Sequence, residues 1–337
     1  MSPRLDAPPR NRVLIGDARA QLARLPSGSV DCCLTSPPYY QLRDYQIAGQ
    51  YGLEADIGGW VDHLEAVCAE LARILTPTGS LWLNLADSYS GAPREGAPVK
   101  SLLLGPERLL LRLIGQGWRV RNKLIWAKSN PMPSPVRDRL SCTHEAVYLL
   151  VRNGSYFFDL DAIRVPHQGR QPKRQSAVGS GGLVPASWRI RSGDDSGILA
   201  LKAAGRAGHP LGKNPGDVWT LATGAYRGSH YAAMPLALAE RVIRAGCPER
   251  RCARCRAPWQ RPLHRPDLAT AIQSSLAPTC ACGAPSEPGL VVDPFFGTGT
   301  TALAAERHGR DWLGVELNPA FPAQADERLH RQRDRAA

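Results

Sequence analysis

The chain has 337 residues, of which 43% are apolar and 21% are charged, a composition typical of a folded globular protein. No run of 18 apolar residues occurs, and the first ten residues are too polar for a signal peptide, so we expect no membrane partner and a location in the cytoplasm or nucleoid. The formal net charge of +12 favours a polyanionic partner, because lysine and arginine gain free energy by releasing counterions from phosphates.

The first part of the chain predicts strands that alternate with helices. Apolar runs at residues 12–17 and 30–34 indicate two strands, and the amphipathic stretch at 18–25 between them indicates a helix, which completes a βαβ unit. A helix is then expected from about residue 60 to 75, ended by the sequence TPTG, and a strand at residues 80–85.

The alternation continues with one long interruption. A Leu-rich helix ending at Gly115 and a strand at residues 118–128 precede a Pro-rich stretch, and residues 144–151 and 156–158 are again strand-like. After the interruption, the expected elements are a strand at residues 217–219, a helix at 235–245, a strand at 289–292, a helix to about residue 308, a strand at 311–316 and a terminal helix. The fold class is therefore α/β, with a doubly wound, mostly parallel, Rossmann-like sheet.

The interruption is strongly basic. Residues 161–213 carry nine Lys or Arg against three Asp, a net charge of +6, and lack hydrophobic periodicity. This stretch is either a patch that binds nucleic acid or a solvated basic loop. If it binds DNA, removing charge at Lys173, Arg174, Arg189 and Arg191 should weaken binding and flatten its salt dependence.

The sequence TSPPYY at residues 35–40 places a hydroxyl, a rigid turn and an aromatic ring at the end of a buried strand, which two prolines stop. Such a turn suits a flipped-out nucleobase. The base would stack on Tyr39, while Ser36 and the Pro37 carbonyl accept hydrogen bonds from an exocyclic amine. The alternative is an ordinary turn between a strand and a loop.

The sequence DPFFGTGTT at residues 293–301 lies between an apolar strand and a helix, where glycines let the backbone approach a ligand. Glu316 ends the next strand, 23 residues after Asp293, the spacing of an acid that binds ribose hydroxyls. The loop is neither G-x-G-x-x-G nor a phosphate-binding loop, so a pyrophosphate ligand is disfavoured. S-adenosylmethionine fits better, because its ammonium group can meet the acid at the start of the loop. A tight turn without a ligand is the alternative.

Three motifs in this order, TSPPYY at residue 35, DPFFGTGTT at 293 and GVELNP at 314, resemble those of the amino-methylating DNA methyltransferases. They resemble the permuted beta group, in which the catalytic motif precedes the cofactor motif. The serine at position 36 is similar to the N4-cytosine branch, since adenine-N6 enzymes usually carry Asp or Asn there. The resemblance implies a circularly permuted S-adenosylmethionine-dependent methyltransferase fold that methylates a flipped-out cytosine in double-stranded DNA, with adenine N6 as the runner-up.

The resemblance also implies a mechanism. The cytosine N4 lone pair is delocalised into the ring, so acceptors at Ser36 and the Pro37 carbonyl would hold the amine with its lone pair toward the methyl group. Pro38 and Tyr39 complete the catalytic turn. The methyl group would transfer directly, with Asp87 or water accepting the proton. The alternative for Asp87 is a turn or cap residue.

The motif from DVW at residues 217–219 to GSHY at residues 228–231 resembles the part of the family that closes over the methionine portion of the cofactor. The cofactor-binding residues implied by the resemblance are Asp17, Ala18, His230, Asp293, Phe295, Gly297, Thr298, Gly299, Thr300, Glu316 and Asn318. A homodimer, a cognate restriction endonuclease acting on the same site and an orphan modification enzyme all stay open.

Other reactions fit the sequence less well. Cytosine-C5 methylation in its family needs a Pro-Cys nucleophile, which does not occur here, and Cys32 and Cys33 are expected in the core. A nicotinamide-dependent oxidoreductase on the same fold is disfavoured by the missing third glycine and by the SPPY turn. A noncatalytic protein that binds zinc and DNA is also disfavoured, because it would not need both the SPPY turn and the loop at residues 293–301.

The cysteines suggest a metal site. Cys252-x2-Cys255 and Cys280-x-Cys282, separated by 24 residues, offer four thiolates for a tetrahedral structural zinc ion. Free thiols are the alternative, and Cys247 is either a competing ligand or a helix-end residue.

These interpretations divide the chain into five regions. They are a catalytic half at residues 11–160, a basic target-recognition region at 161–216, a cofactor-closing motif and helix at 217–246, a cysteine-rich insertion at 247–288 and a cofactor-binding half at 289–333.

Overall fold

The computed structural model describes residues 3–166, 209, 211–224, 234–264 and 272–335. The chain divides into two compact units. The first comprises Met1–Ile163, Gly216–Gln260 and Ala277–Ala337, and the second comprises Arg164–Pro215 and Arg261–Leu276.

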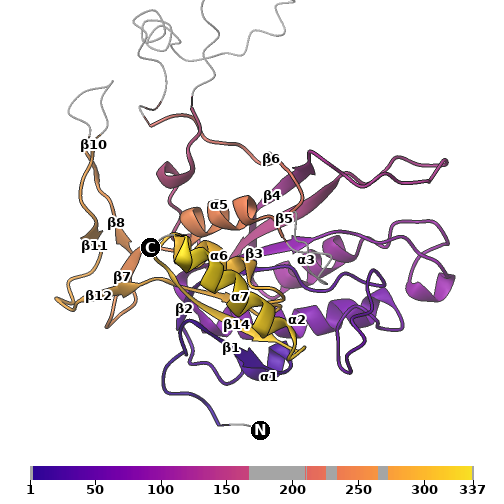
Figure 1. Ribbon diagram of the computed structural model, residues 1–337, viewed down its shortest axis with the longest axis horizontal. Coiled ribbons are helices and arrows are strands. Elements are labelled where there is room, and N and C mark those ends of the chain that lie inside the picture. The colour runs from indigo at the N-terminus through magenta and orange to yellow at the C-terminus, as the bar shows by residue number, and fades with distance from the viewer. Residues whose placement is uncertain (1–2, 167–208, 210, 225–233, 265–271, 336–337) are drawn as a thin grey trace, which may run out of the picture. The chain divides into compact units, whose positions relative to one another are not determined.

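An eight-stranded sheet forms the centre of the first unit (Figure 1). Its strand order is β1-β14-β13-β2-β3-β5-β4-β6. The strands are β1 (Arg12–Ile15), β2 (Val30–Thr35), β3 (Leu75–Leu85), β4 (Arg119–Lys128), β5 (His144–Val151), β6 (Val218–Leu221), β13 (Leu290–Asp293) and β14 (Asp311–Glu316). Every neighbouring pair is parallel except the two pairs that contain β5. The mostly parallel α/β sheet expected from the sequence is confirmed.

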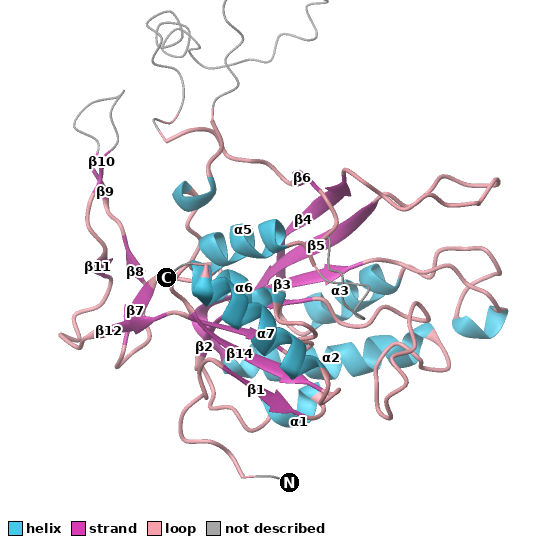
Figure 2. Cartoon of the chain, in the orientation of Figure 1, coloured by secondary structure: helices cyan, strands magenta, loops and turns pink. Residues whose placement is uncertain are grey.

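Helices cover both faces of this sheet (Figure 2). On one face lie α1 (Ala18–Leu22), α2 (Ile57–Ile74) and α3 (Gly105–Gly115), and on the other lie α5 (Leu236–Gly246), α6 (Thr300–Arg307) and α7 (Phe321–Asp334). Cys32 and Cys33 point into opposite cores because side chains alternate along β2, and both are fully buried. None of the helices in the described part of the chain has the length and hydropathy of a transmembrane segment.

Two expected elements differ in the structure. β3 begins at Leu75, directly after α2, because residues 76–79 form a bulge at which the register with β2 shifts. The proline in this bulge does not have to donate a hydrogen bond to the sheet. Residues 156–158, expected as a strand, are irregular, and Phe158 stacks on Trp82 with ring centres 6.3 Å apart.

The remaining described elements are short. In the first unit, β7 (Arg250–Cys252) pairs with β12 (Ser286–Pro288), β8 (Trp259–Gln260) pairs with β11 (Ala277–Pro278), and single 3-10 turns lie at η1 (Pro93–Glu95) and η2 (Asp161–Ile163). In the second unit, β9 (Leu263–His264) pairs with β10 (Ile272–Gln273). All three strand pairs are antiparallel.

Candidate active site

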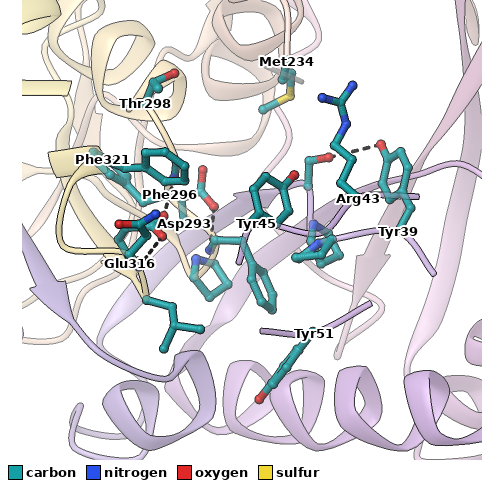
Figure 3. A pocket seen from close by; sticks show the side chains of 18 of the residues that line it. Tyr39, Arg43, Tyr45, Tyr51, Met234, Asp293, Phe296, Thr298, Glu316 and Phe321 are labelled. Carbon is teal, nitrogen blue, oxygen red and sulfur yellow. Dashed lines mark hydrogen bonds between the residues drawn. The ribbon is translucent and has the colours of Figure 1, made fainter. Parts of the chain in front are cut away.

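A pocket with a volume of about 430 Å³ lies at the carboxyl ends of β1, β14, β13 and β2, four neighbouring strands of the sheet (Figure 3). Open α/β sheets bind their ligands at this edge. The pocket brings together predicted catalytic and cofactor-binding residues that are far apart in the sequence. Its lining includes Asp17, Ala18, Ser36, Pro37, Pro38, Tyr39, Asp293, Phe295, Gly297, Thr298, Thr300, Glu316 and Asn318.

Asp293 ends β13 and is almost completely buried, with 4% of its surface exposed. Its carboxylate accepts hydrogen bonds from Thr35 Oγ1 at 2.7 Å, Thr301 Oγ1 at 2.6 Å and the Phe295 backbone N–H at 3.1 Å. Burial outweighs these donors and raises the pKa of Asp293 to about 6. A cationic ligand would therefore stabilise the ionised carboxylate. The bond from Thr35 also joins the catalytic turn directly to the cofactor loop.

Glu316 ends β14, next to β13 in the sheet. Its carboxylate accepts hydrogen bonds from the backbone N–H groups of Gly297 at 2.7 Å and Asn318 at 2.8 Å, and burial raises its pKa. Figure 3 shows Glu316 and Asp293 on one side of the pocket and Tyr39 on the other, with Tyr45 between them. The pocket thus has an acidic side and a side formed by the catalytic turn.

Two glycines leave room for Phe296 beneath the cofactor loop. A Cβ atom at Gly314 would lie 2.4 Å from the Phe296 ring, and one at Gly299 would lie 3.1 Å from it. Gly299 also has a φ of +77°, in the left-handed region that favours glycine. Phe296 stacks on Trp312 with ring centres 5.3 Å apart. Gly299, predicted as a cofactor-binding residue, therefore shapes the loop and is not among the residues that line the pocket.

The segment between β2 and α2 adds aromatic side chains to the pocket. Tyr51 donates a hydrogen bond to Asp17 at 2.9 Å, and its ring meets Phe295 edge to face at 5.6 Å. Tyr45 meets Phe321 edge to face at 6.4 Å. Sequence reasoning did not select Tyr45, Tyr51 or Phe321, which lie outside the motifs. For the two tyrosines, the Tyr-rich composition of the segment was the available signal.

The catalytic turn is held by bonds from outside the pocket. The Trp60 indole N–H donates to the Pro38 carbonyl at 2.9 Å, and Ser88 Oγ donates to the Tyr40 carbonyl at 2.6 Å. Among the described residues, no group donates a hydrogen bond to the Pro37 carbonyl. Pro37 itself lines the pocket.

Ser36 and Tyr39 belong to a hydrogen-bond network with Asn84 and Glu145. The Tyr39 hydroxyl donates to Glu145 Oε2 at 2.6 Å, and Asn84 Nδ2 donates to the same carboxylate oxygen at 2.9 Å and to the Tyr39 oxygen at 3.0 Å. Burial, together with the Glu145 carboxylate, raises the pKa of Tyr39 well above its usual value, so Tyr39 keeps its proton. Because that proton points to Glu145, Ser36 is the donor in its 3.1 Å bond with Tyr39.

This direction of the bond decides what the Ser36 oxygen can do. The hydroxyl proton points to Tyr39, so both lone pairs of Ser36 Oγ are acceptors. Asn84 Nδ2 approaches one of them at 3.4 Å. The other is left for a donor in the pocket.

Glu145 is a charged residue of the site that sequence reasoning also missed. Its second carboxylate oxygen forms an ion pair with Lys128 Nζ at 2.7 Å, and both residues line the pocket. The sequence HEAVYLLV around it reads as an ordinary buried strand. Glu145 lies near the start of β5, and the antiparallel pairing of β5 with β3 and β4 brings its carboxylate to the catalytic turn.

Comparison with known proteins agrees with this geometry. A family model of N6/N4 methyltransferases, described as a DNA methylase, matches residues 30–327, a span that contains both loops of the pocket. The chain belongs to this DNA methylase family. It is therefore an amino-methylating DNA methyltransferase, as the motifs implied.

Curated relatives match this methylase along most of its length. The type II methyltransferase M.XycI of Xanthomonas campestris pv. cyanopsidis is 31% identical to the methylase, over 94% of the methylase and 87% of M.XycI. The type II methyltransferase M.SmaI of Serratia marcescens is 29% identical, over 96% and 91% of the two chains.

Solved structures share the fold of the methylase. The PvuII DNA methyltransferase, described as cytosine-N4-specific, aligns with a TM-score of 0.58 and 20% identity over 96% of the methylase and 87% of its own chain. A putative DNA modification methylase of Thermus thermophilus, complexed with S-adenosyl-L-methionine, aligns with a TM-score of 0.52 and 24% identity over 95% of each chain. The expected methyltransferase fold is confirmed.

One predicted catalytic residue of the methylase does not lie in the pocket. Asp87 is not among the lining residues, and its carboxylate accepts hydrogen bonds from the backbone N–H groups of Leu104 at 2.8 Å and Gly105 at 3.1 Å, at the amino terminus of α3. These contacts fit the alternative interpretation of Asp87 as a cap residue, and we give it no part in the chemistry. His230 lies outside the described residues.

The methylase also places its clustered cysteines together. The Sγ atoms of Cys252, Cys255, Cys280 and Cys282 all lie within 4.8 Å of one another. Cys247 is not in this group. Cys247 directly follows the last residue of α5 and is fully buried. Its position therefore fits the alternative of a helix-end residue.

Proposed function

We propose that the methylase transfers the methyl group of S-adenosylmethionine to the exocyclic N4 amine of a cytosine flipped out of double-stranded DNA. The observation that carries the proposal is a single pocket in which the catalytic turn and the acidic cofactor loop meet, joined by the 2.7 Å bond between Thr35 and Asp293. Ser36, in place of the acid or amide of adenine-N6 enzymes, favours cytosine. The relatives named as type II methyltransferases support a place in a restriction-modification system.

The acidic side of the pocket fits S-adenosylmethionine, which supplies an electrophilic methyl group when bound. Asp293 and Glu316 are carboxylates that burial makes reluctant to ionise, so positive charge beside them is stabilising and a pyrophosphate would be repelled. We assign Asp293 to the ammonium group. Glu316 is assigned to the ribose hydroxyls, because a carboxylate oxygen that already accepts one backbone N–H can accept another donor.

The catalytic turn supplies two acceptors for an amine that has two N–H bonds. One is the Pro37 carbonyl, and the other is the lone pair of Ser36 Oγ that the network with Tyr39 leaves open. Holding both N–H bonds out of the conjugated plane localises the N4 lone pair and aims it at the methyl group. Because Glu145 fixes the direction of the Tyr39 proton, it acts as a positioning residue for Ser36.

Proton removal needs no dedicated base in this scheme. Once N4 has accepted a methyl group it carries a positive charge and becomes strongly acidic, so its proton can pass to solvent. Asp87 caps α3, and the Glu145 carboxylate is occupied by Tyr39, Asn84 and Lys128.

The product identifies the target base. The methylase is incubated with unmethylated DNA and S-adenosylmethionine, the DNA is digested to nucleosides, and the methylated base is identified by mass spectrometry. We expect N4-methylcytosine. N6-methyladenine as the product would contradict the assignment to cytosine but not the methyl transfer.

A further inference from the structure

We propose that Cys252, Cys255, Cys280 and Cys282 bind one zinc ion, and that this metal site holds the starts of the two strands that carry the catalytic turn and the cofactor loop. The site is separate from the pocket, since none of the four cysteines lines it.

The cysteines have the arrangement that zinc requires. Zinc bound by four thiolates is tetrahedral, with Zn–S bonds of about 2.3 Å and therefore sulfur atoms about 3.8 Å apart. The four Sγ atoms already lie within 4.8 Å of one another, and none of these cysteines forms a disulfide.

The surrounding segment has little else to hold it together. The strands β7, β8, β11 and β12 have two or three residues each and pair only as two-stranded ribbons. Isolated ribbons of this kind are marginally stable in water. A crosslink through zinc would join the first ribbon strand, which ends at Cys252, to the segment that holds Cys280 and Cys282.

Arg251, next to the zinc ligand Cys252, connects this segment to the central sheet. Arg251 has 1% of its surface exposed, and its guanidinium contacts Asp31 Oδ2 at 2.7 Å and the Ser29 carbonyl at 2.9 Å. The same oxygen of Asp31 accepts the backbone N–H of Leu290 at 2.8 Å. Asp31 lies near the start of β2 and Leu290 begins β13, so one buried ion pair joins both strands at the end opposite the pocket.

Two further contacts make the connection firm. Arg251 also bonds to Glu287 of β12 at 2.8 Å, and Arg256, in the turn after Cys255, donates to the Gly28 carbonyl at 2.6 Å. A buried ion pair is stable only when its geometry is fixed, because removal from water costs both charges free energy. The zinc ion would supply that fixed geometry by setting the position of Arg251.

The metal content tests the site itself. The full-length protein is expressed in zinc-containing medium, purified without chelator and analysed for metals by mass spectrometry. We expect about one zinc ion per chain in the wild type and in Cys142→Ser, an exposed cysteine outside the cluster, and close to none in Cys255→Ser and Cys282→Ser. If the variants do not fold, the wild type alone tests the site. A thiol-blocking mercurial should then release one zinc ion per chain from it. Iron in place of zinc, or a wild type without metal, would overturn the proposal.

Hydrogen exchange tests the connection to the sheet. When a chelator and the mercurial remove zinc from the wild type, we expect the amide of Leu290 and those of β2 to exchange at least about tenfold faster, while those of β5 change less than about twofold. Uniform exchange changes over all strands, or no change at Leu290, would show that the metal site does not hold these strands. Neither result depends on methyl transfer, so the test is independent of the proposed function.

Discussion

Ser36 carries the distinction between cytosine and adenine in the proposed reaction. Replacing it with alanine removes one of the two acceptors for the target amine and none of the cofactor contacts. We expect Ser36→Ala to lower the rate of methyl transfer about 10²- to 10³-fold, the usual effect of removing one preorganised polar group from a reaction centre. Single-turnover methylation measures the rate, and calorimetry should show unchanged binding of S-adenosylmethionine. Full activity of this variant would contradict the role of Ser36.

Glu145 acts on Ser36 through Tyr39. In Glu145→Gln the amide is a weaker acceptor for the Tyr39 proton and Lys128 loses its ion-pair partner, so the Ser36 hydroxyl is no longer held as an acceptor. We expect the rate of methyl transfer to fall about tenfold or more, with cofactor affinity unchanged.

A matched control for Glu145 exists in the same protein. Glu107 also accepts hydrogen bonds from a lysine and a tyrosine, Lys123 at 2.7 Å and Tyr148 at 3.3 Å, but does not line the pocket. Glu107→Gln should leave the methylation rate close to that of the wild type. Equal rate losses in the two variants would show that Glu145 only stabilises the fold.

Asp293 makes the binding of the cofactor depend on pH. With a pKa of about 6, its carboxyl group is mostly protonated at pH 5 and mostly ionised at pH 7. A cationic ligand prefers the ionised form, so the affinity for S-adenosylmethionine should rise about tenfold between these pH values and level off above them. The raised pKa of Glu316 acts in the same direction.

Calorimetry at a series of pH values measures this dependence. In Asp293→Asn, binding should be weaker at pH 7 and its pH dependence smaller than in the wild type. An affinity that falls between pH 5 and pH 7 would contradict a positive group beside Asp293.

At the scale of elements, one threonine hydroxyl adds a buried side-chain hydrogen bond between the ends of the paired strands β2 and β13. Thr35→Val keeps the shape of the side chain but removes a donor to the buried Asp293 carboxylate, which should cost about 1–3 kcal/mol of unfolding free energy. Thr76→Val is the matched control, since Thr76 is also buried in the neighbouring strand β3 and its hydroxyl has no partner within the described residues. Urea denaturation should show that only Thr35→Val is destabilised. Equal effects of the two substitutions would contradict the importance of this bond.

The elements that form the pocket were largely predictable because local sequence determines them. The SPPYY turn and the glycine loop each follow a short, buried, mostly apolar strand, and strand ends of a parallel sheet gather at one edge. The contacts of Asp87 and Glu145 were not predictable, since they depend on which distant segments pack together. Asp87 meets the start of α3, and Glu145 reaches Tyr39 only because β5 runs antiparallel to its neighbours.

Local patterns placed two strands differently from the structure. TPTG ends the helix as predicted, since α2 stops at Ile74, but the same residues form a bulge within β3, so this strand begins at Leu75 and not at residue 80. The aromatic run at residues 156–158 has the composition of a strand, yet Phe158 packs on Trp82.

At the scale of the whole molecule, the uneven charge predicts how the methylase binds DNA. Residues 161–213 hold a net charge of +6, half of the total of +12. Lys173, Arg174, Arg189 and Arg191 belong to this stretch and lie outside the described residues. Neutralising all four should weaken binding and reduce the slope of log K against log salt by up to about 3.6, if each contacts one phosphate. The substitutions are Lys173→Gln, Arg174→Gln, Arg189→Gln and Arg191→Gln. Titrations at several salt concentrations measure the slope.

The control for charge alone comes from α7. Arg331 and Arg333 form ion pairs with Glu327 and Glu306 on the surface of the first unit. Neutralising both should leave the salt slope nearly unchanged. A slope that is the same in the wild type and the fourfold variant would show that the basic stretch does not contact DNA.

The bond between Thr35 and Asp293 joins residues 258 positions apart, and this separation matters while the protein is being made. At about 5–20 residues per second, a ribosome completes the catalytic turn roughly 10–50 s before it adds the cofactor loop. β13 and β14 also have to insert between β2 and β1, which are made first, before the sheet is continuous. A nascent or prematurely terminated chain that ends before Asp293 therefore has the turn for a target base but no acidic loop for a methyl donor. Modification of DNA can begin only after the cofactor loop has been translated.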